Sequence, residues 1–240
     1  MPQERTEAVV LRGVDFSETS RIVTFLCPER GRMACIAKGV KRPKSQLAGL
    51  LDTFNRLEIV VYYKDSRSVQ VLAEASLLDS FTALKSDLDR TTYGAFPLEI
   101  VDRVARENEP SRELYAALVE GLEGLGTWTG DVRTHCCWQV LRLLGIAGFA
   151  PSLDVCCECG ASAGDRPSFS FGGGVTCARC PSDRRLARED YAALKAFAAH
   201  TRRCPDIEVN ATLFSLLDRY ASRQLETNLK SARVIEQVFR

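Results

Sequence analysis

Residues 21–37 of the chain form the stretch RIVTFLCPERGRMACIA. It contains two apolar runs, 21–26 and 33–37, on either side of the turn sequence Pro28-Glu29-Arg30-Gly31. Short runs of β-branched, aromatic and other apolar residues that are bounded by Pro and Gly are typical of strands. The stretch therefore predicts two consecutive strands joined by a turn.

Similar runs lie on both sides of this stretch. Residues 8–11 precede it, and residues 57–63 and 69–72 follow it, separated from each other by the turn sequence Lys64-Asp65-Ser66-Arg67. Five strands in about 75 residues, with one longer connection at 39–53, fit a small barrel better than a sandwich, and the OB-fold has this strand number. We expect a five-stranded OB-fold barrel over residues 1–80.

The apolar residues adopt a helical period after residue 80. Leucines at positions 114, 118, 122 and 125 recur at the spacing of one helix face. Breaks are expected at Pro97, at Pro110 and within Gly124–Gly130, so the region should form several helices. We expect an α+β multidomain protein in which residues 81–150 and 186–240 form the two parts of a helical bundle. Residues 151–185 are then a module inserted into that bundle.

Four of the ten cysteines form two pairs with the spacing of metal ligands. Cys156 and Cys159 make one Cys-x2-Cys pair, and Cys177 and Cys180 make the other after an interval of 17 residues. A gap of two residues lets one tight turn present two sulfurs, and four thiolates are a usual ligand set of structural Zn²⁺. The pairs predict one structural zinc ion. Catalytic zinc is not expected, because four thiolates leave no open position for water.

Three further residues leave alternatives open at this site. Cys157 can compete with its neighbour for a place in the first pair. His200 and Cys204 can act as a substitute ligand pair, although a surface histidine near a helix end is the favoured explanation of His200.

A net charge of +1 conceals an uneven distribution of charge. Residues 29–44 have a net charge of +5, residues 87–123 a net charge of −5, and residues 179–203 are basic again. Such asymmetry suits an anion-binding surface, and cations in a long loop of an OB-fold can follow phosphates across the barrel face. A solvated charged loop is the alternative. The predicted phosphate-binding residues are Arg32, Lys38, Lys41, Arg42 and Lys44, with Arg184, Arg185 and Arg188 extending the path.

The sequence indicates a binding protein rather than an enzyme. It has no GxxxxGK[ST], GxSxG or HExxH motif and only two histidines. Three aromatic residues of the barrel, Phe54, Tyr62 and Tyr63, can stack on bases or belong to the core. No apolar run approaches the roughly 20 residues of a membrane span, and no signal peptide is recognisable, so we expect a cytoplasmic protein. A competing interpretation is a zinc-ribbon transcription or partner-docking protein whose OB domain binds protein.

Several segments together resemble the bacterial RecO family of recombination mediators. The N-terminal segments are the most specific, and the resemblance extends through the two cysteine pairs to the tail, so that it covers essentially the whole chain. The segments are Ala8–Leu11, Glu18–Thr24, Glu29–Arg32, Ala37–Ser45 and Leu229–Ser231.

The resemblance implies a cytoplasmic, nucleoid-associated repair protein that binds single- and double-stranded DNA and anneals complementary strands. It also implies that the protein joins RecR in loading RecA onto DNA coated with single-strand-binding protein. Helical surfaces in the family receive the acidic, apolar C-terminal tail of that coating protein, and on charge grounds Arg142 is our candidate anchor for it. Some members lack the cysteines, which favours a structural role for the metal.

Overall fold

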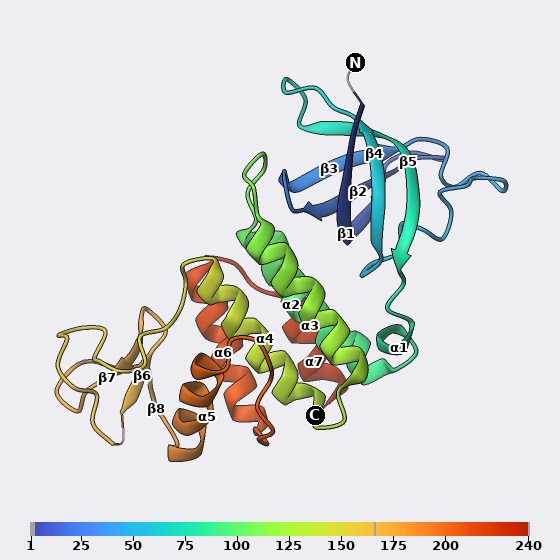
Figure 1. The fold of residues 1–240 in the computed structure, drawn as a ribbon. Helices are drawn as coiled ribbons and strands as arrows, with labels where there is room; N and C mark the ends of the chain where they lie inside the picture. Colours follow the sequence, from blue (N-terminus) through green and yellow to red (C-terminus); the bar gives the residue numbers. More distant parts are fainter. Residues whose placement is uncertain (1–2, 166, 240) are drawn as a thin grey trace. The chain divides into compact units, whose positions relative to one another are not determined.

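The computed structural model describes residues 3–165 and 167–239, which form eight strands and seven helices (Figure 1). Contacts within the chain divide it into two units. The first comprises the described residues of Met1–Thr91 and Val101–Thr127, and the second those of Thr92–Ile100 and Trp128–Arg240. The mixed α and β composition confirms the predicted fold class, whereas the individual domain limits stay a prediction.

The first unit contains the expected five-stranded closed barrel, with strand order β1-β2-β3-β5-β4. All neighbouring strands are antiparallel except β3 and β5, which are parallel. Strand β1 pairs with β4 through its first half, residues 3–9, and with β2 through its second half, residues 9–15. The strands are β1 (Gln3–Asp15), β2 (Arg21–Cys27), β3 (Gly31–Ala37), β4 (Arg56–Tyr62) and β5 (Val69–Asp79).

Alternation of side chains along the strands creates the barrel core. In β3, Met33, Cys35 and Ala37 are buried, and the residues between them are only half-buried. Cys27 and Cys35 are both fully buried in this core. Burial raises the pKa of Cys35 to about 12 and also raises that of Cys27, so both thiols are neutral packing groups.

The acidic segment of the sequence neutralises basic residues of the barrel. The first unit also holds α1 (Thr82–Lys85), α3 (Arg112–Thr127) and both ends of α2 (Leu88–Val104). Asp102 of α2 accepts a hydrogen bond from Arg12 of β1 at 2.8 Å. Glu107 pairs with Arg32 of β3, and Glu123 with Arg56 of β4, so part of the negative charge of residues 87–123 is balanced within the first unit.

Helix α2 corrects one prediction, because it continues through Pro97. Proline has no N–H, so the carbonyl of Tyr93, four residues earlier, loses its helical donor. The buried thiol of Cys136 donates to this oxygen at 3.4 Å. A tertiary hydrogen bond thus replaces the missing backbone bond. The expected break within Gly124–Gly130 is present, because α3 ends at Thr127 and the next helix begins at Val132.

The second unit contains a helical bundle, in which α4 packs against α5 and α6. The carboxylate of Glu99 in α2 accepts from the backbone N–H groups of Lys230 and Ser231 at 3.1 and 2.8 Å, which satisfies two donors at the start of α7. The helices of the bundle are α4 (Val132–Ile146), α5 (Arg188–Ala199), α6 (Ala211–Gln224) and α7 (Lys230–Val238).

The segment between α4 and α5 forms a small module with a three-stranded sheet, in the order β7-β6-β8. Phe169 of this sheet is fully buried and contacts the ring of Tyr220 in α6 at a centroid distance of 5.6 Å. This edge-to-face contact and its buried area fix the module to the bundle. The strands are β6 (Ser168–Ser170), β7 (Gly174–Thr176) and β8 (Arg184–Arg185).

Candidate metal centre and nucleic-acid interface

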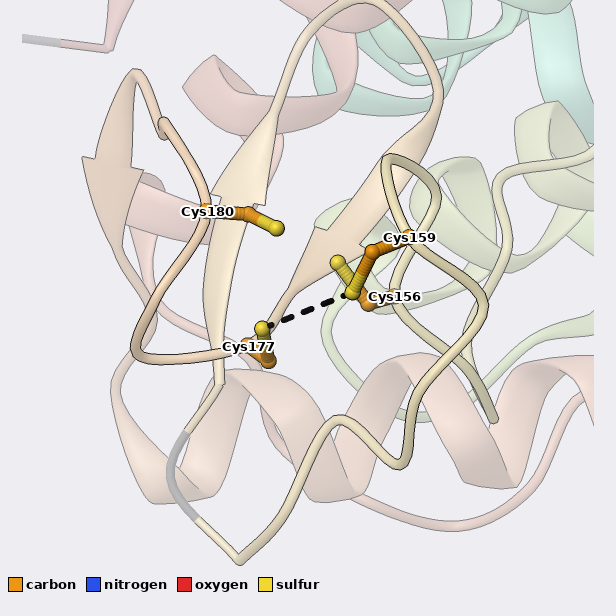
Figure 2. A group of neighbouring side chains, drawn as sticks. All are labelled: Cys156, Cys159, Cys177 and Cys180. Atoms are coloured by element: carbon orange, nitrogen blue, oxygen red, sulfur yellow. Dashed lines mark hydrogen bonds between the residues drawn. The ribbon is translucent and has the colours of Figure 1, made fainter.

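Four cysteine sulfurs converge in the small module, as Figure 2 shows. The Sγ atoms of Cys156, Cys159, Cys177 and Cys180 all lie within 4.8 Å of one another, and those of Cys159 and Cys177 are 3.8 Å apart. A tetrahedron with Zn–S distances of about 2.3 Å has edges of about 3.8 Å, so this separation suits a metal bound between the thiolates. A disulfide would need an S–S distance of about 2.05 Å. The group is therefore positioned to bind a metal ion.

Backbone hydrogen bonds build the two turns that carry the sulfurs. The N–H of Gly160 donates to the carbonyl of Cys156 at 2.9 Å, and Gly160 has a φ of +72°, which glycine adopts without steric cost. The N–H of Cys180 donates to the carbonyl of Cys177 at 3.2 Å. Each Cys-x2-Cys pair thus lies within one locally hydrogen-bonded turn. The sequence alone can therefore indicate the ligands.

The surroundings of the cysteines favour thiolates. The backbone N–H of Cys177 donates to the Cys156 sulfur and lowers the pKa of that thiol to about 6. The backbone N–H of Arg179 likewise lowers the pKa of Cys177. Hydrogen bonding with the Cys159 sulfur raises the pKa of Cys180 to about 12, because a proton is shared inside the group. A cation at the centre would replace that proton.

The three alternative ligands lie outside the group. The Cys157 thiol donates to the carbonyl of Gly174 at 3.7 Å instead of joining the other sulfurs. Nδ1 of His200 lies 2.8 Å from the carbonyl of Ala196, and Cys204 is buried with its thiol near the Pro205 carbonyl. Within the described residues, the metal-ligating group is the one that the two x2 pairs predict.

The predicted phosphate-binding loop leaves β3 and is largely exposed. Lys38, Arg42 and Lys44 are exposed, and no ion pair of theirs occurs among the described residues. Lys41 differs, because its ammonium group lies 2.9 Å from a carboxylate oxygen of Asp15. This contact lowers the pKa of Asp15. Three cations of the loop are therefore available to an anion, and the fourth is shared with the end of β1.

Arg32 lies among acidic side chains. Its guanidinium is 3.0 Å from the carboxylate of Glu107 and 3.8 Å from that of Asp102. The Arg32 side chain is 32 % exposed, so an incoming phosphate would have to compete with these two carboxylates. Its role at a phosphate stays a prediction.

Comparison with known proteins identifies the family. The family model described as "Recombination protein O N terminal" matches residues 1–81, and "Recombination protein O C terminal" matches residues 85–233. The chain is 35 % identical to the DNA repair protein RecO of Salinibacter ruber over 209 residues, which cover 87 % of this chain and 80 % of that protein. It is 33 % identical to the DNA repair protein RecO of a Nocardioides species, over 97 % of this chain and 99 % of that protein.

This chain belongs to the RecO family. The two matched regions include the closed barrel, the helices α2 to α6 and the four-cysteine module, so the RecO resemblance of the sequence is confirmed. Family membership makes the chain a DNA repair protein of the RecO type. Within its described residues, no helix combines the length and the apolar character needed to cross a membrane.

The remaining basic residues predicted for this RecO-family chain lie in the second unit. Arg184 and Arg185 form the short strand β8, which pairs with β6, and Arg188 is the first residue of α5. Arg185 and Arg188 are exposed, and Arg184 is half-buried. A path from the barrel loop to these arginines would join the two units, and it stays a prediction.

Arg142, the candidate anchor for a partner tail, lies on α4. It is half-buried, and its guanidinium carbon is 5.6 Å from the centroid of the Trp138 indole. A cation over an indole face gains a favourable interaction with the ring. The position is compatible with a cationic anchor, and the assignment stays a prediction.

The aromatic residues considered from sequence do not provide an exposed ring. Phe54 and Tyr63 are each only 4 % exposed, and Tyr62 is half-buried. The exposed aromatic ring of the barrel belongs to Phe16, which is 62 % exposed in the connection between β1 and β2. Sequence reasoning missed it because it is a single aromatic residue in a polar turn, with no periodic pattern around it.

Proposed function

We propose that this chain is a non-enzymatic mediator of recombinational DNA repair. It binds single- and double-stranded DNA, anneals complementary strands and, together with RecR, promotes the loading of RecA onto DNA coated with single-strand-binding protein. The observation that carries the proposal is the exposed cationic loop on the closed barrel of a chain that belongs to the RecO family.

Electrostatics explains how such a loop would promote annealing. Lys38, Arg42 and Lys44 can neutralise the phosphates of one strand because they have no acidic partner among the described residues. Two strands held on a neutralised surface repel each other less and can search for the complementary register. This process requires no nucleotide hydrolysis and no covalent intermediate.

We propose zinc as the metal of the four-cysteine group. The ligands are Cys156, Cys159, Cys177 and Cys180, and a tetrahedral thiolate site of this kind stabilises a fold without an open position for substrate. The module has only short strands and little core of its own, so a metal ion would supply much of its stability. The site is thus structural.

The proposed partners follow from the same family resemblance. The acidic, apolar C-terminal tail of single-strand-binding protein would bind the helical part, with Arg142 as the cationic anchor. RecR would be a direct partner, and RecA would be recruited indirectly. We place the protein in the cytoplasm, associated with the nucleoid.

The decisive experiment is annealing of complementary strands that have been coated with single-strand-binding protein, without nucleotide. Faster annealing than that of the same coated strands without this chain supports the mediator function. A chain that binds partner proteins but does not accelerate annealing would support the partner-docking alternative instead.

A salt titration tests the phosphate contacts. With the three loop cations that form no ion pair within the described residues, Lys38, Arg42 and Lys44, the slope of log K against log[salt] for single-stranded DNA should be about −2.1. Contacts by Lys41 and Arg32, which have carboxylate partners, would bring it to about −3.5. Arg42→Ala/Lys44→Ala should reduce the slope by about 1.4 for every sequence tested. A matched control removes two exposed cations elsewhere, Lys230→Ala/Arg233→Ala, and should leave the slope unchanged. A slope near zero in the unmodified protein would refute phosphate binding by the loop.

A further inference from the structure

Phe16 exposes its aromatic ring in the connection between β1 and β2. It directly follows β1, and its ring remains 62 % exposed, as does 53 % of Val14 two residues earlier. A single exposed apolar residue is ordinary, whereas an exposed phenylalanine in a polar turn beside a cationic loop has the chemistry of a base-stacking group.

The turn that carries Phe16 has a defined conformation. The backbone N–H groups of Phe16 and Ser17 both donate to the carbonyl of Ser20, at 3.0 and 3.3 Å. The N–H of Ser20 in return donates to the Ser17 hydroxyl at 3.2 Å. These bonds fix the backbone of the turn that carries the exposed ring before any ligand arrives, which reduces the entropy lost on binding.

Two contacts join this turn to the cationic loop. The N–H of Lys41 donates to the carbonyl of Thr19 at 3.1 Å, and the Lys41 ammonium group bonds Asp15, the residue before Phe16. Asp15 and the exposed Glu18 are the acidic groups of the turn, and Lys41 neutralises the first of them. The aromatic ring and the exposed cations of residues 38–44 therefore belong to one continuous surface of the first unit.

We propose that Phe16 stacks on an unpaired base of a single DNA strand whose phosphates lie along the Lys38–Lys44 loop. The inference rests on the proposed DNA binding and adds a preference to it: a single strand offers an exposed base face, and a paired duplex does not. The charge complementarity of the adjoining loop selects a nucleic acid rather than an apolar protein surface as the occupant.

The test compares a 15-nucleotide single strand with an abasic strand of equal length and charge. Phe16→Ala should weaken binding to the normal strand by roughly 5- to 100-fold and leave binding to the abasic strand unchanged. Phe16→Trp should restore binding, and Val14→Ala, an exposed apolar residue in the same connection, should have no effect. Because Phe16 is exposed, its substitution should not unfold the barrel.

The outcomes separate this inference from the proposed function. If the unmodified protein binds the normal strand in a salt-dependent manner but Phe16→Ala binds it equally well, stacking is refuted and DNA binding stands. Equal weakening on normal and abasic strands also refutes stacking, since the ring would then act without a base. If the unmodified protein binds neither strand, both the inference and the proposed DNA binding are refuted.

Discussion

His135 should make the stability of the second unit depend on pH in a way that can be measured. It lies on α4 and is 2 % exposed, with its ring 5.6 Å from that of Trp128 and 5.2 Å from that of Trp138. Burial disfavours the charged imidazolium and lowers the pKa of His135 from 6.5 to about 4. The folded protein therefore keeps this side chain neutral in a range where the unfolded chain is protonated.

The sign and size of the effect follow from this difference. Between pH 6.5 and 4 the unfolded chain binds the additional proton, so the free energy of unfolding falls as pH falls. From pH 7 to 5.5, His135 should lower it by about 1.2 kcal/mol. Asp218 opposes this, because burial raises its pKa from 3.8 to about 6 and the folded protein then gains stability on acidification. Its contribution over the same range is about 0.5 kcal/mol after allowance for partial exposure.

Urea unfolding at pH 7 and 5.5, followed by tryptophan fluorescence, measures these terms. Both tryptophans of the chain lie in the second unit, so the signal reports that unit. Relative to a Cys136→Ala control, His135→Leu should remove about 1.2 kcal/mol of the loss on acidification. Asp218→Asn should increase that loss by about 0.5 kcal/mol. Cys136 is a suitable control because it is buried beside His135 and burial raises its thiol pKa, so it stays neutral throughout.

Both variants retain the four-cysteine group. Any contribution of that group to the pH dependence therefore cancels when the two variants are compared. If His135→Leu and Cys136→Ala lose the same stability between pH 7 and 5.5, the buried neutral imidazole is not the source of the effect.

Three other substitutions test separate contacts. Glu99→Gln weakens the carboxylate cap of α7 and should cost about 1 kcal/mol locally, seen as faster amide hydrogen exchange in the first turn of that helix; unchanged exchange would contradict the cap. Gly174→Ala would place a Cβ 2.3 Å from the Ser152 carbonyl oxygen at a φ of +123°, so bound zinc per chain, measured by metal analysis, should decrease. Glu107→Gln removes one carboxylate from Arg32, and the salt slope for single-stranded DNA should steepen by about 0.7 if that arginine then meets a phosphate.

Zinc removal gives one more expected outcome. Purified protein should contain about one zinc per chain, and a chelator should release it with loss of order in residues 151–185 while the barrel stays folded. Metal analysis and exchange rates of the β1–β5 amides measure the two effects. Native protein that lacks metal, or a barrel that unfolds on chelation, would contradict a local structural role.

The sequence alone determined the features that depend on short spacings. Apolar runs bounded by turn residues predict the strands of the barrel, and the structure then shows every second residue of 31–37 buried in the core. The two Cys-x2-Cys pairs predict their ligands for the same reason: each pair lies within one hydrogen-bonded turn. The length of β5 was not predicted correctly from the sequence, which indicated residues 69–72. The strand continues to Asp79 because it pairs with β4 as far as Arg56.

Tertiary structure decided what depends on residues far apart in the chain. Helix α2 passes through Pro97 because Cys136, 43 residues from Tyr93, supplies the missing donor. Arg32 lies near the carboxylate of Asp102 because the end of helix α2, 70 residues further along the chain, lies beside β3. The guanidinium of Arg32 also donates to the backbone carbonyl of Asp102. Phe16 lies beside the cationic loop because the N–H of Lys41 in that loop donates to Thr19 in the turn that carries the ring. No local period encodes such contacts, since they form only after the apolar faces of separate elements have packed together.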